Sequence, residues 1–226
     1  MERMKFMLDG WNCQVTVVPA SASVEPMALL IEPIDRRDLE FLDREVDFLK
    51  EHARRGFALA TFIVEDWNSA LSPWKADPVF GKEAFGEGAG TTLAFIENTL
   101  IPEMQKRVPG LGETILGGYS LAALFALWAG YESPSFSAVA AASPSVWFPG
   151  WMEYAKQRRP QAKRVYLSLG EAEPKTRNRT MATVGDCIRE MDALLADTPH
   201  ILEWNPGNHF KDADLRTAKA FLWCCN

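Results

Sequence analysis

A serine follows a glycine pair in the middle of this chain and precedes a long apolar segment. The sequence GGYSLA occupies residues 117–122, directly after the apolar run at residues 114–116. A nucleophile elbow places a serine on a sharp turn between a strand and a helix, and the residues two before and two after it must be small because the turn brings them together. Gly118 and Ala122 meet this need, although Ala stands where the pattern usually has Gly. The pattern therefore predicts that Ser120 is a nucleophile.

The backbone after Ser120 suits the same chemistry. A helix that begins here leaves its first N–H groups unpaired, and such groups stabilise negative charge that develops on a reacting oxygen. We expect the N–H of Leu121 to be one donor of an oxyanion hole. The alternative interpretation is a tight turn in which Ser120 only caps the helix.

The chain has three histidines from which a catalytic base could be drawn. His52 falls in a predicted helix ahead of the serine, and His200 begins the last predicted strand. His209 lies in the sequence NPGNHF at residues 205–210, which leaves the carboxyl end of that strand. Ligands of parallel α/β sheets bind at the carboxyl ends of the strands, and the chain order serine, acid, histidine is typical of this kind of triad. We therefore predict His209 as the base.

The acid of a triad is expected between the serine and the histidine. The apolar run RVYLSL at residues 164–169 predicts a buried strand there, and GEAEPK follows at residues 170–175. A carboxylate that accepts the Nδ1–H of the histidine fixes its tautomer and stabilises the imidazolium. Glu171 and Glu173 are both candidates, and spacing alone does not choose between them.

The elements that must position these residues alternate along the chain. Segments with the apolar or β-branched character of strands are residues 14–19, 27–31, 57–64, 114–116, 136–142, 164–169 and 200–204. Segments with helical character are residues 35–55, 91–108, 121–130, 151–158, 178–195 and 213–223. Strands that alternate with helices predict an α/β fold with a mostly parallel central sheet and helices on both faces.

Local signals predict where some of these elements begin and end. Asp35 is a suitable N-cap for the first helix, and Gly56 a suitable end. Pro102 falls inside the second helix and predicts a kink or a break. Residues 65–90 are rich in Gly, Pro and Trp and predict a long loop, and connections of this length are often functional.

Length and composition exclude several classes of protein. The chain has 226 residues and a net charge of −6, which argues against a duplex-binding protein, and its longest apolar run is too short to span a bilayer. We expect one domain, residues 1–226, with little or no lid. The scattered His and Cys residues predict no metal and no cofactor. The first residues lack a secretory apolar core, and the four cysteines fit reduced thiols, so we expect a cytoplasmic protein. The sequence is compatible with a homo-oligomer.

Three segments together resemble a known family. GGYSLAALFALWA, VYLSLGEAEPKTRN and EWNPGNHF are similar to the putative esterase family of α/β-hydrolases, which includes enterochelin esterases, esterase D and feruloyl esterases. The resemblance implies an α/β-hydrolase fold and a serine esterase. The family's acid typically lies three residues after the glycine that closes its strand, which implies Glu173, with Glu171 as second choice. The family often has Asp at this position, and Pro174 constrains the turn here.

The resemblance also implies a second oxyanion donor in the loop after the third strand. In this chain that donor is the backbone N–H of Trp67 or Asn68. Trp74 continues the same loop, Trp147 follows the strand of small residues, and Tyr119 precedes the nucleophile, so we expect these three to line the substrate pocket. Aromatic side chains at such positions favour flat or apolar groups. Core packing is the alternative for each tryptophan.

These observations predict a serine carboxylic-ester hydrolase with a Ser-His-Glu triad. It would act through an acyl-enzyme on a small-molecule ester with a small or aromatic group. A thioesterase or an acyltransferase could use the same site. A hydrolase-like fold that only binds its ligand is a further alternative, because fold alone does not specify function.

Overall fold

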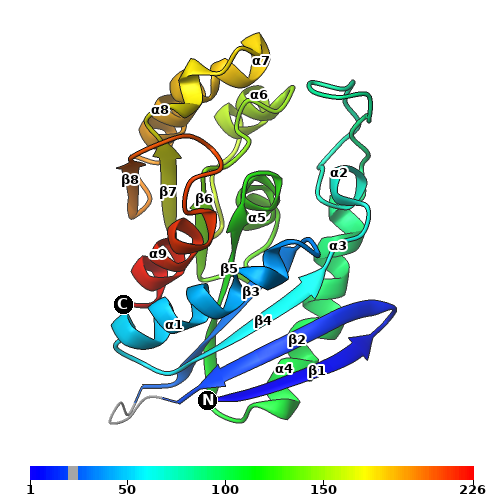
Figure 1. The fold of residues 1–226 in the computed structure, drawn as a ribbon, viewed down its shortest axis with the longest axis vertical. Coiled ribbons are helices and arrows are strands. Elements are labelled where there is room, and N and C mark those ends of the chain that lie inside the picture. The colour runs from blue at the N-terminus through cyan, green and yellow to red at the C-terminus, as the bar shows by residue number, and fades with distance from the viewer. Residues whose placement is uncertain (20–24) are drawn as a thin grey trace.

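An eight-stranded sheet forms the centre of the molecule in a computed structural model that describes residues 1–19 and 25–226. The strands are β1 (Glu2–Leu8), β2 (Trp11–Val18), β3 (Met27–Ile34), β4 (Phe57–Ile63), β5 (Leu111–Tyr119), β6 (Ala138–Ala142), β7 (Arg164–Gly170) and β8 (His200–Asn205). Their order in the sheet is β1-β2-β4-β3-β5-β6-β7-β8, as Figure 1 shows. β2 is antiparallel to both of its neighbours, β1 and β4. The remaining neighbours in the sheet, from β4 through β3, β5, β6 and β7 to β8, are all parallel.

Helices cover both faces of the sheet. The helical elements are η1 (Asp38–Glu40), α1 (Leu42–His52), α2 (Trp67–Ala70), α3 (Ala89–Phe95), η2 (Ile96–Leu100), α4 (Ile101–Arg107), α5 (Leu121–Glu132), α6 (Trp151–Lys156), η3 (Glu173–Lys175), α7 (Arg179–Ala182), α8 (Val184–Leu194) and α9 (Ala213–Cys225). α1 and α9 pack together on one face, and α5 and α8 pack on the other. This arrangement confirms the α/β fold with a mostly parallel sheet that the alternating pattern predicts.

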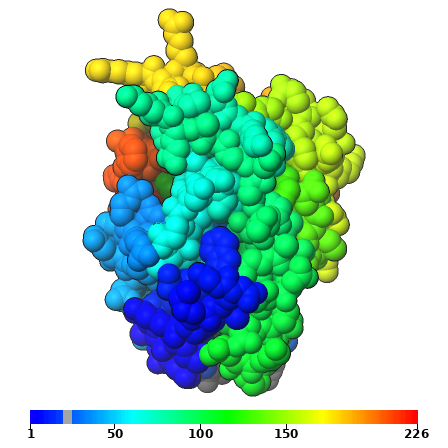
Figure 2. All heavy atoms as spheres, turned by 90° about the vertical axis from the view of Figure 1, so that its right-hand side faces the viewer, coloured from blue at the N-terminus to red at the C-terminus, as the bar shows by residue number. Residues whose placement is uncertain are grey.

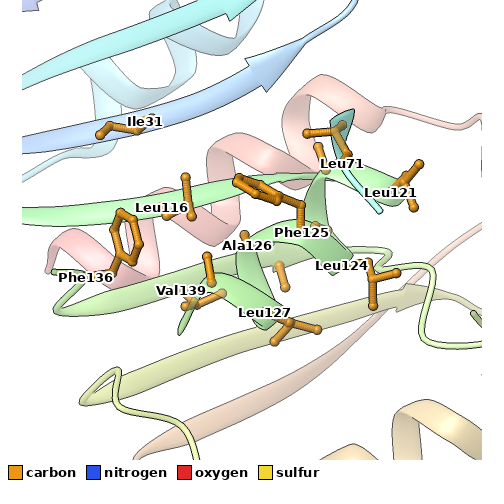
Figure 3. Close-up of a cluster of buried hydrophobic side chains, with 14 of the residues drawn as sticks. Ile31, Leu71, Leu116, Leu121, Leu124, Phe125, Ala126, Leu127, Phe136 and Val139 are labelled. Carbon is orange, nitrogen blue, oxygen red and sulfur yellow. The ribbon is translucent and has the colours of Figure 1, made fainter. Parts of the chain in front are cut away.

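Helix α5 directly follows Ser120 and is almost entirely buried. Ten of its twelve residues are buried, which explains why its sequence is apolar on all sides. Phe125 and Leu124 lie in a cluster with Leu116 of β5, Val139 of β6 and Phe136, as Figure 3 shows. Burial of this kind fixes α5 against the sheet and therefore fixes the residue that precedes it.

The first predicted helix begins later than expected. Asp35 is not its N-cap, because the Asp35 carboxylate accepts the backbone N–H groups of Arg37 and Asp38 in a local turn. The 3₁₀ turn η1 follows, and α1 begins only at Leu42. The helix also ends before Gly56, with Ala53 as its C-cap.

Pro102 does not break the second predicted helix. α3, the π-helical turn η2 and α4 follow each other without a gap, and Pro102 occupies the first turn of α4. A proline inside a helix removes one backbone donor and crowds the carbonyl four residues back. Here the turn directly before Pro102 is π-helical, and the Ile101 N–H bonds to the Ile96 carbonyl five residues back. Two other predictions also differ from the structure. Residues 65–90, predicted as a loop, contain the short helix α2, and the predicted helix at 178–195 is divided into α7 and α8.

The antiparallel edge of the sheet contains β1, which the sequence analysis missed. Trp11 of β2 stacks on Phe95 of α3, with ring centroids 5.0 Å apart, and the Arg107 guanidinium lies over the Phe6 ring of β1. Figure 2 shows this side of the molecule, with the strands in blue beside the green helices. None of the helices in residues 1–19 and 25–226 is both long enough and apolar enough to cross a bilayer.

We expect Gly117→Ala to destabilise the fold, because a Cβ at this position in β5 would lie 2.7 Å from the Phe221 ring of α9 and 2.8 Å from the Ala140 Cβ. Overpacking of this kind typically costs about 1–3 kcal/mol. Gly90→Ala is the control, since nothing lies within 4 Å of its added Cβ in α3, and it should stabilise by about 0.5–1 kcal/mol. Urea unfolding measures both, and a Gly117→Ala midpoint equal to wild type would contradict this account of how α9 packs.

Candidate active site

Ser120 lies on a strained turn between β5 and α5. Its backbone has φ +59° and ψ −117°, a region that non-glycine residues rarely adopt and that is often found at functional sites. A Cβ added to Gly118 would lie 2.7 Å from the Cβ of Ala122. The two small residues of the motif therefore meet across the turn, as the nucleophile-elbow pattern requires.

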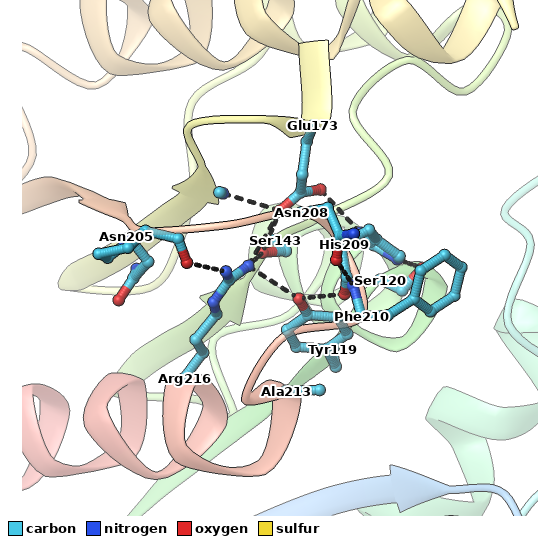
Figure 4. A network of polar contacts seen from close by, with 12 residues as sticks. Tyr119, Ser120, Ser143, Glu173, Asn205, Asn208, His209, Phe210, Ala213 and Arg216 are labelled. Atoms are coloured by element: carbon cyan, nitrogen blue, oxygen red, sulfur yellow. Dashed lines mark hydrogen bonds and ion pairs between the residues drawn. The ribbon is translucent and has the colours of Figure 1, made fainter. Parts of the chain in front are cut away.

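Ser120, His209 and Glu173 form a hydrogen-bonded series, which Figure 4 shows. His209 Nε2 lies 3.0 Å from Ser120 Oγ, and His209 Nδ1 lies 2.7 Å from Glu173 Oε2. The serine follows β5, the glutamate follows β7 in the short turn η3, and the histidine lies in the loop after β8. All three come from the carboxyl edge of the parallel strands, where residues from different loops converge.

Glu173 and Glu171 differ sharply in their surroundings. Glu171 is exposed, whereas Glu173 is 7% exposed and its Oε1 accepts hydrogen bonds from the Gly170 N–H at 2.7 Å and the Ser143 hydroxyl at 2.9 Å. Burial alone would raise the pKa of Glu173. The hydrogen bond and charge of His209, with the Gly170 and Ser143 donors, lower that pKa below its usual value. The carboxylate therefore stays ionised beside the histidine.

Arg216 connects the acid to the histidine loop. This side chain of α9 is 2% exposed, and its Nη1 lies 3.2 Å from Glu173 Oε1 and donates to the Tyr119 hydroxyl at 3.1 Å. The Tyr119 hydroxyl in turn donates to the His209 carbonyl at 2.7 Å. Arg216 also donates from Nη2 to the Pro206 carbonyl at 3.1 Å. One buried guanidinium thus contacts the His209 loop directly at Pro206 and indirectly, through Tyr119, at His209.

The expected oxyanion donors lie at the starts of two helices. Leu121 is the first residue of α5, and Trp67 and Asn68 are the first two residues of α2. Backbone N–H groups in a first turn have no intrahelical acceptor. The Asp66 side chain caps α2 by accepting the N–H of Ser69, which leaves the earlier N–H groups of α2 to other acceptors. Their role at an oxyanion stays a prediction.

A cavity of about 430 Å³ opens beside Ser120. Ser120, His209, Tyr119 and Trp67 line it, together with the exposed ring of Phe210. The cavity runs from the triad toward β3, α1 and the start of α9. It is large enough for a small organic ligand.

Trp74 and Trp147 do not line this cavity. Trp74 packs against Phe148 and Tyr154, and its Nε1 donates to the Pro149 carbonyl at 2.8 Å. Trp147 is 8% exposed and contacts Phe85, which in turn contacts Phe148. Packing explains the position of both rings, and their assignment to a substrate pocket remains a prediction.

The other two histidines lie away from Ser120. His52 stacks on Phe48 in α1, and His200 contacts Asp192 of α8. His209 was predicted because it follows the serine and the acid in the chain and lies at the carboxyl end of a strand. In the structure it is the histidine that contacts Ser120.

Three polar residues of the site were missed from the sequence. Ser143 donates to Glu173 Oε1, Arg216 binds the same oxygen, and Ser145 Oγ lies 3.3 Å from Ser120 Oγ. The two serines lie in the loop after β6, so the expectation that functional residues follow the carboxyl ends of parallel strands could have found them. Arg216 lies inside a helix, and nothing in its local sequence indicates this contact.

Solved structures with the same fold are similar to this chain over nearly its whole length. A siderophore hydrolase, EstB, from Aspergillus nidulans is 18% identical, with a TM-score of 0.79 and coverage of 99% of this chain and 94% of the other. An IroE-like serine hydrolase from Shewanella oneidensis is 17% identical, with a TM-score of 0.81 and coverage of 99% and 80%. The fluorophosphonate-binding serine hydrolase FphF from Staphylococcus aureus is 12% identical, with a TM-score of 0.62 and coverage of 100% and 98%.

The sequence itself matches a family model described as "Putative esterase" over residues 49–206. No curated protein matches the chain in sequence. The solved structures agree with the α/β-hydrolase fold, and the matched region contains Ser120 and Glu173 and includes most of the parallel sheet. Because the family model spans well over half of the sequence, the chain belongs to the putative esterase family and is an esterase.

Proposed function

We propose that this esterase is a serine carboxylic-ester hydrolase in which Ser120 is the nucleophile, His209 the general base and Glu173 the acid of the triad. The observation that carries the proposal is the hydrogen-bonded series from Glu173 to His209 at 2.7 Å and from His209 to Ser120 at 3.0 Å, beside a cavity. In this arrangement the Nδ1–H of His209 donates to Glu173, which leaves Nε2 free to accept the serine proton.

Acylation begins when Ser120 Oγ attacks the ester carbonyl and its proton passes to His209 Nε2. The tetrahedral oxyanion is stabilised by the N–H of Leu121 and by that of Trp67 or Asn68. The C–O bond to the alcohol then breaks, and the alcohol leaves with the proton from His209. The ionised carboxylate of Glu173 stabilises the imidazolium during this step, and its lowered pKa supports that role.

Deacylation repeats the sequence with water as the nucleophile. His209 takes a proton from water as the water oxygen attacks the acyl carbonyl, and the bond from the acyl carbon to Ser120 Oγ then breaks. His209 returns the proton to Ser120 Oγ, which restores the hydroxyl and the neutral imidazole. Exposed aromatic rings at the cavity mouth, Phe41 and Phe210, favour a small or aromatic ester as the substrate. The proposal includes a cytoplasmic location and no nucleic-acid or membrane partner.

Replacing Ser120 with Ala removes the nucleophile, and we expect turnover of p-nitrophenyl esters to fall by about 10³-fold or more. The same variant should lose labelling by a fluorophosphonate, which reacts only with an activated serine. The Ser145→Ala variant is the matched control, since Ser145 lies 3.3 Å away and should retain labelling. Ester turnover that survives in folded Ser120→Ala would overturn the assignment, and a wild-type chain that binds esters without reacting would indicate a binding protein.

The two glutamates of the loop after β7 offer a direct comparison. Glu173→Gln replaces the buried acceptor of the histidine N–H, and we expect kcat to fall by about 10²–10⁴-fold because the imidazolium loses its partner. Glu171→Gln, which changes the same charge two residues away on an exposed side chain, should retain nearly full activity. Steady-state kinetics of the two variants separates them, and a defect confined to Glu171→Gln would show that the acid is misassigned.

Arg216 is a positioning residue in this proposal, because it contacts Glu173 and Tyr119 but lines no part of the cavity. We expect Arg216→Met to lower kcat by about tenfold or more with KM little changed, since a misplaced triad affects the transition state rather than substrate binding. Tyr119→Phe removes only the link to the His209 carbonyl and should have the smaller effect. A rise in KM at unchanged kcat would instead place Arg216 in substrate binding.

A further inference from the structure

The far end of the cavity beside Ser120 holds two buried carboxyl groups that the proposed mechanism does not use. Glu32 lies on β3 and Glu45 on α1, and both line the cavity that also contains Ser120 and His209. Their side chains are deeply buried, at 5% and 4% exposed. A carboxyl group is rarely buried this deeply unless it is paired with a cation.

Neither glutamate has a cationic partner in the described part of the chain. Glu32 Oε2 and Glu45 Oε1 are buried oxygens without a donor, and no ion pair among residues 1–19 and 25–226 includes either residue. The charged groups that act on the pair are acidic. Burial and the nearby Asp38 raise the pKa of Glu32, and burial together with Glu32, Asp214 and Asp38 raises the pKa of Glu45. The described part of the chain therefore surrounds the two carboxyl groups with acidic neighbours and supplies no cation.

The arginines that line the same cavity already have partners. Arg37 pairs with Asp35, and Arg44 lies 3.1 Å from Asp212 and 3.4 Å from Asp214. Their charges are therefore balanced at the rim. Neither arginine is therefore a partner of Glu32 or Glu45, and the two carboxyl groups remain able to accept hydrogen bonds from a ligand.

We propose that Glu32 and Glu45 bind a primary ammonium group carried by the ester substrate, so that the enzyme prefers cationic esters to neutral ones. This inference rests on the proposed function, because the same cavity must present the ester carbonyl to Ser120. An ammonium group has three N–H donors and one positive charge. It can donate to both carboxyl groups from the cavity that they line and balance their negative charge.

An organic cation fits this end of the cavity better than a metal ion. In the described residues no group of three or more His, Cys, Asp or Glu side chains has an arrangement that could hold a metal ion. Two carboxyl groups with Phe41 and Leu42 beside them suit instead an ammonium group on an apolar chain.

The register of the sheet sets the distance that such a substrate must span. Ile31 of β3 pairs with Leu116 of β5, so Glu32 is level with Gly117, and Tyr119, the last residue of β5, lies two residues farther along the adjacent strand. Two residues of strand correspond to about 7 Å, and Ser120 follows in the turn beyond them. The ammonium group should therefore be separated from the ester carbonyl by a short flexible chain rather than attached next to it.

Matched esters test the inference. The p-nitrophenyl esters of 6-aminohexanoic acid and heptanoic acid differ by an ammonium group in place of a methyl group, and a second series can carry the same pair of groups in the alcohol. We expect kcat/KM for the ammonium ester to exceed that of its neutral partner by about tenfold or more in one of the two series. Ratios near one in both series would overturn the inference.

Variants identify the groups responsible for the preference. Glu45→Gln should bring the ratio of cationic to neutral kcat/KM close to one, and Glu32→Gln is the second variant should Glu45→Gln fail to fold. Asp47→Asn is the matched control, because it removes the same charge from an exposed position on the same helix and should leave the ratio unchanged. An equal preference in wild type and both glutamine variants would show that the pair does not bind the cation.

The inference and the proposed function fail in different ways. Fluorophosphonate labelling and neutral-ester turnover without any cationic preference would overturn only the inference. Absence of labelling and of turnover would overturn the proposed function. In that case calorimetry still tests the cavity, because wild type should bind hexylammonium more tightly than 1-hexanol and Glu45→Gln should not. Equal binding of the two compounds by wild type would contradict the inference.

Discussion

The buried carboxylate of Glu173 is the interaction on which the site depends. It accepts hydrogen bonds from the backbone at the end of β7, from Ser143 after β6 and from His209 after β8, and it pairs with Arg216 of α9. A buried ion is costly unless several donors compensate it, and removing one partner of such a network leaves the others uncompensated. The loops at the carboxyl edge of the sheet are therefore held in one arrangement by the group that orients the histidine.

The turn at Ser120 depends on packing on both faces of the sheet. Helix α5 is buried on one face, and Phe221 of α9 fills the space over Gly117 on the other. The positive φ of Ser120 costs free energy that this packing offsets. The end of β5, which leads into the strained turn at Ser120, is thus packed between α5 and α9. The cavity lies beside this rigid centre, and its far end is formed by β3 and α1 rather than by the triad loops.

Much of the site could be predicted from the sequence, because its rules are local. The small residues around Ser120, the apolar strand ahead of Glu173 and the loop that contains His209 each leave a pattern in a few adjacent residues. The choice of Glu173 over Glu171 needed either a resemblance or the burial that separates them.

Other features depend on distant contacts and could not be predicted. Arg216 binds Glu173 across 43 residues of sequence. The environment of Trp74 depends on the carbonyl of Pro149, which lies 75 residues away along the chain. The start of α1 was mispredicted because Asp35 satisfies a local turn as readily as it would cap a helix. In each case the local sequence allows two structures, and tertiary packing selects one.

The central claim is that an acyl group is transferred to Ser120 before water releases it. The most direct measurement is a rapid acid quench of the enzyme with a p-nitrophenyl ester, followed by mass spectrometry of the peptide that contains residue 120. The account predicts a burst of p-nitrophenol approaching one equivalent per chain and an acyl group on Ser120. Continued turnover with no acylated Ser120 at any quench time, and no burst, would contradict it.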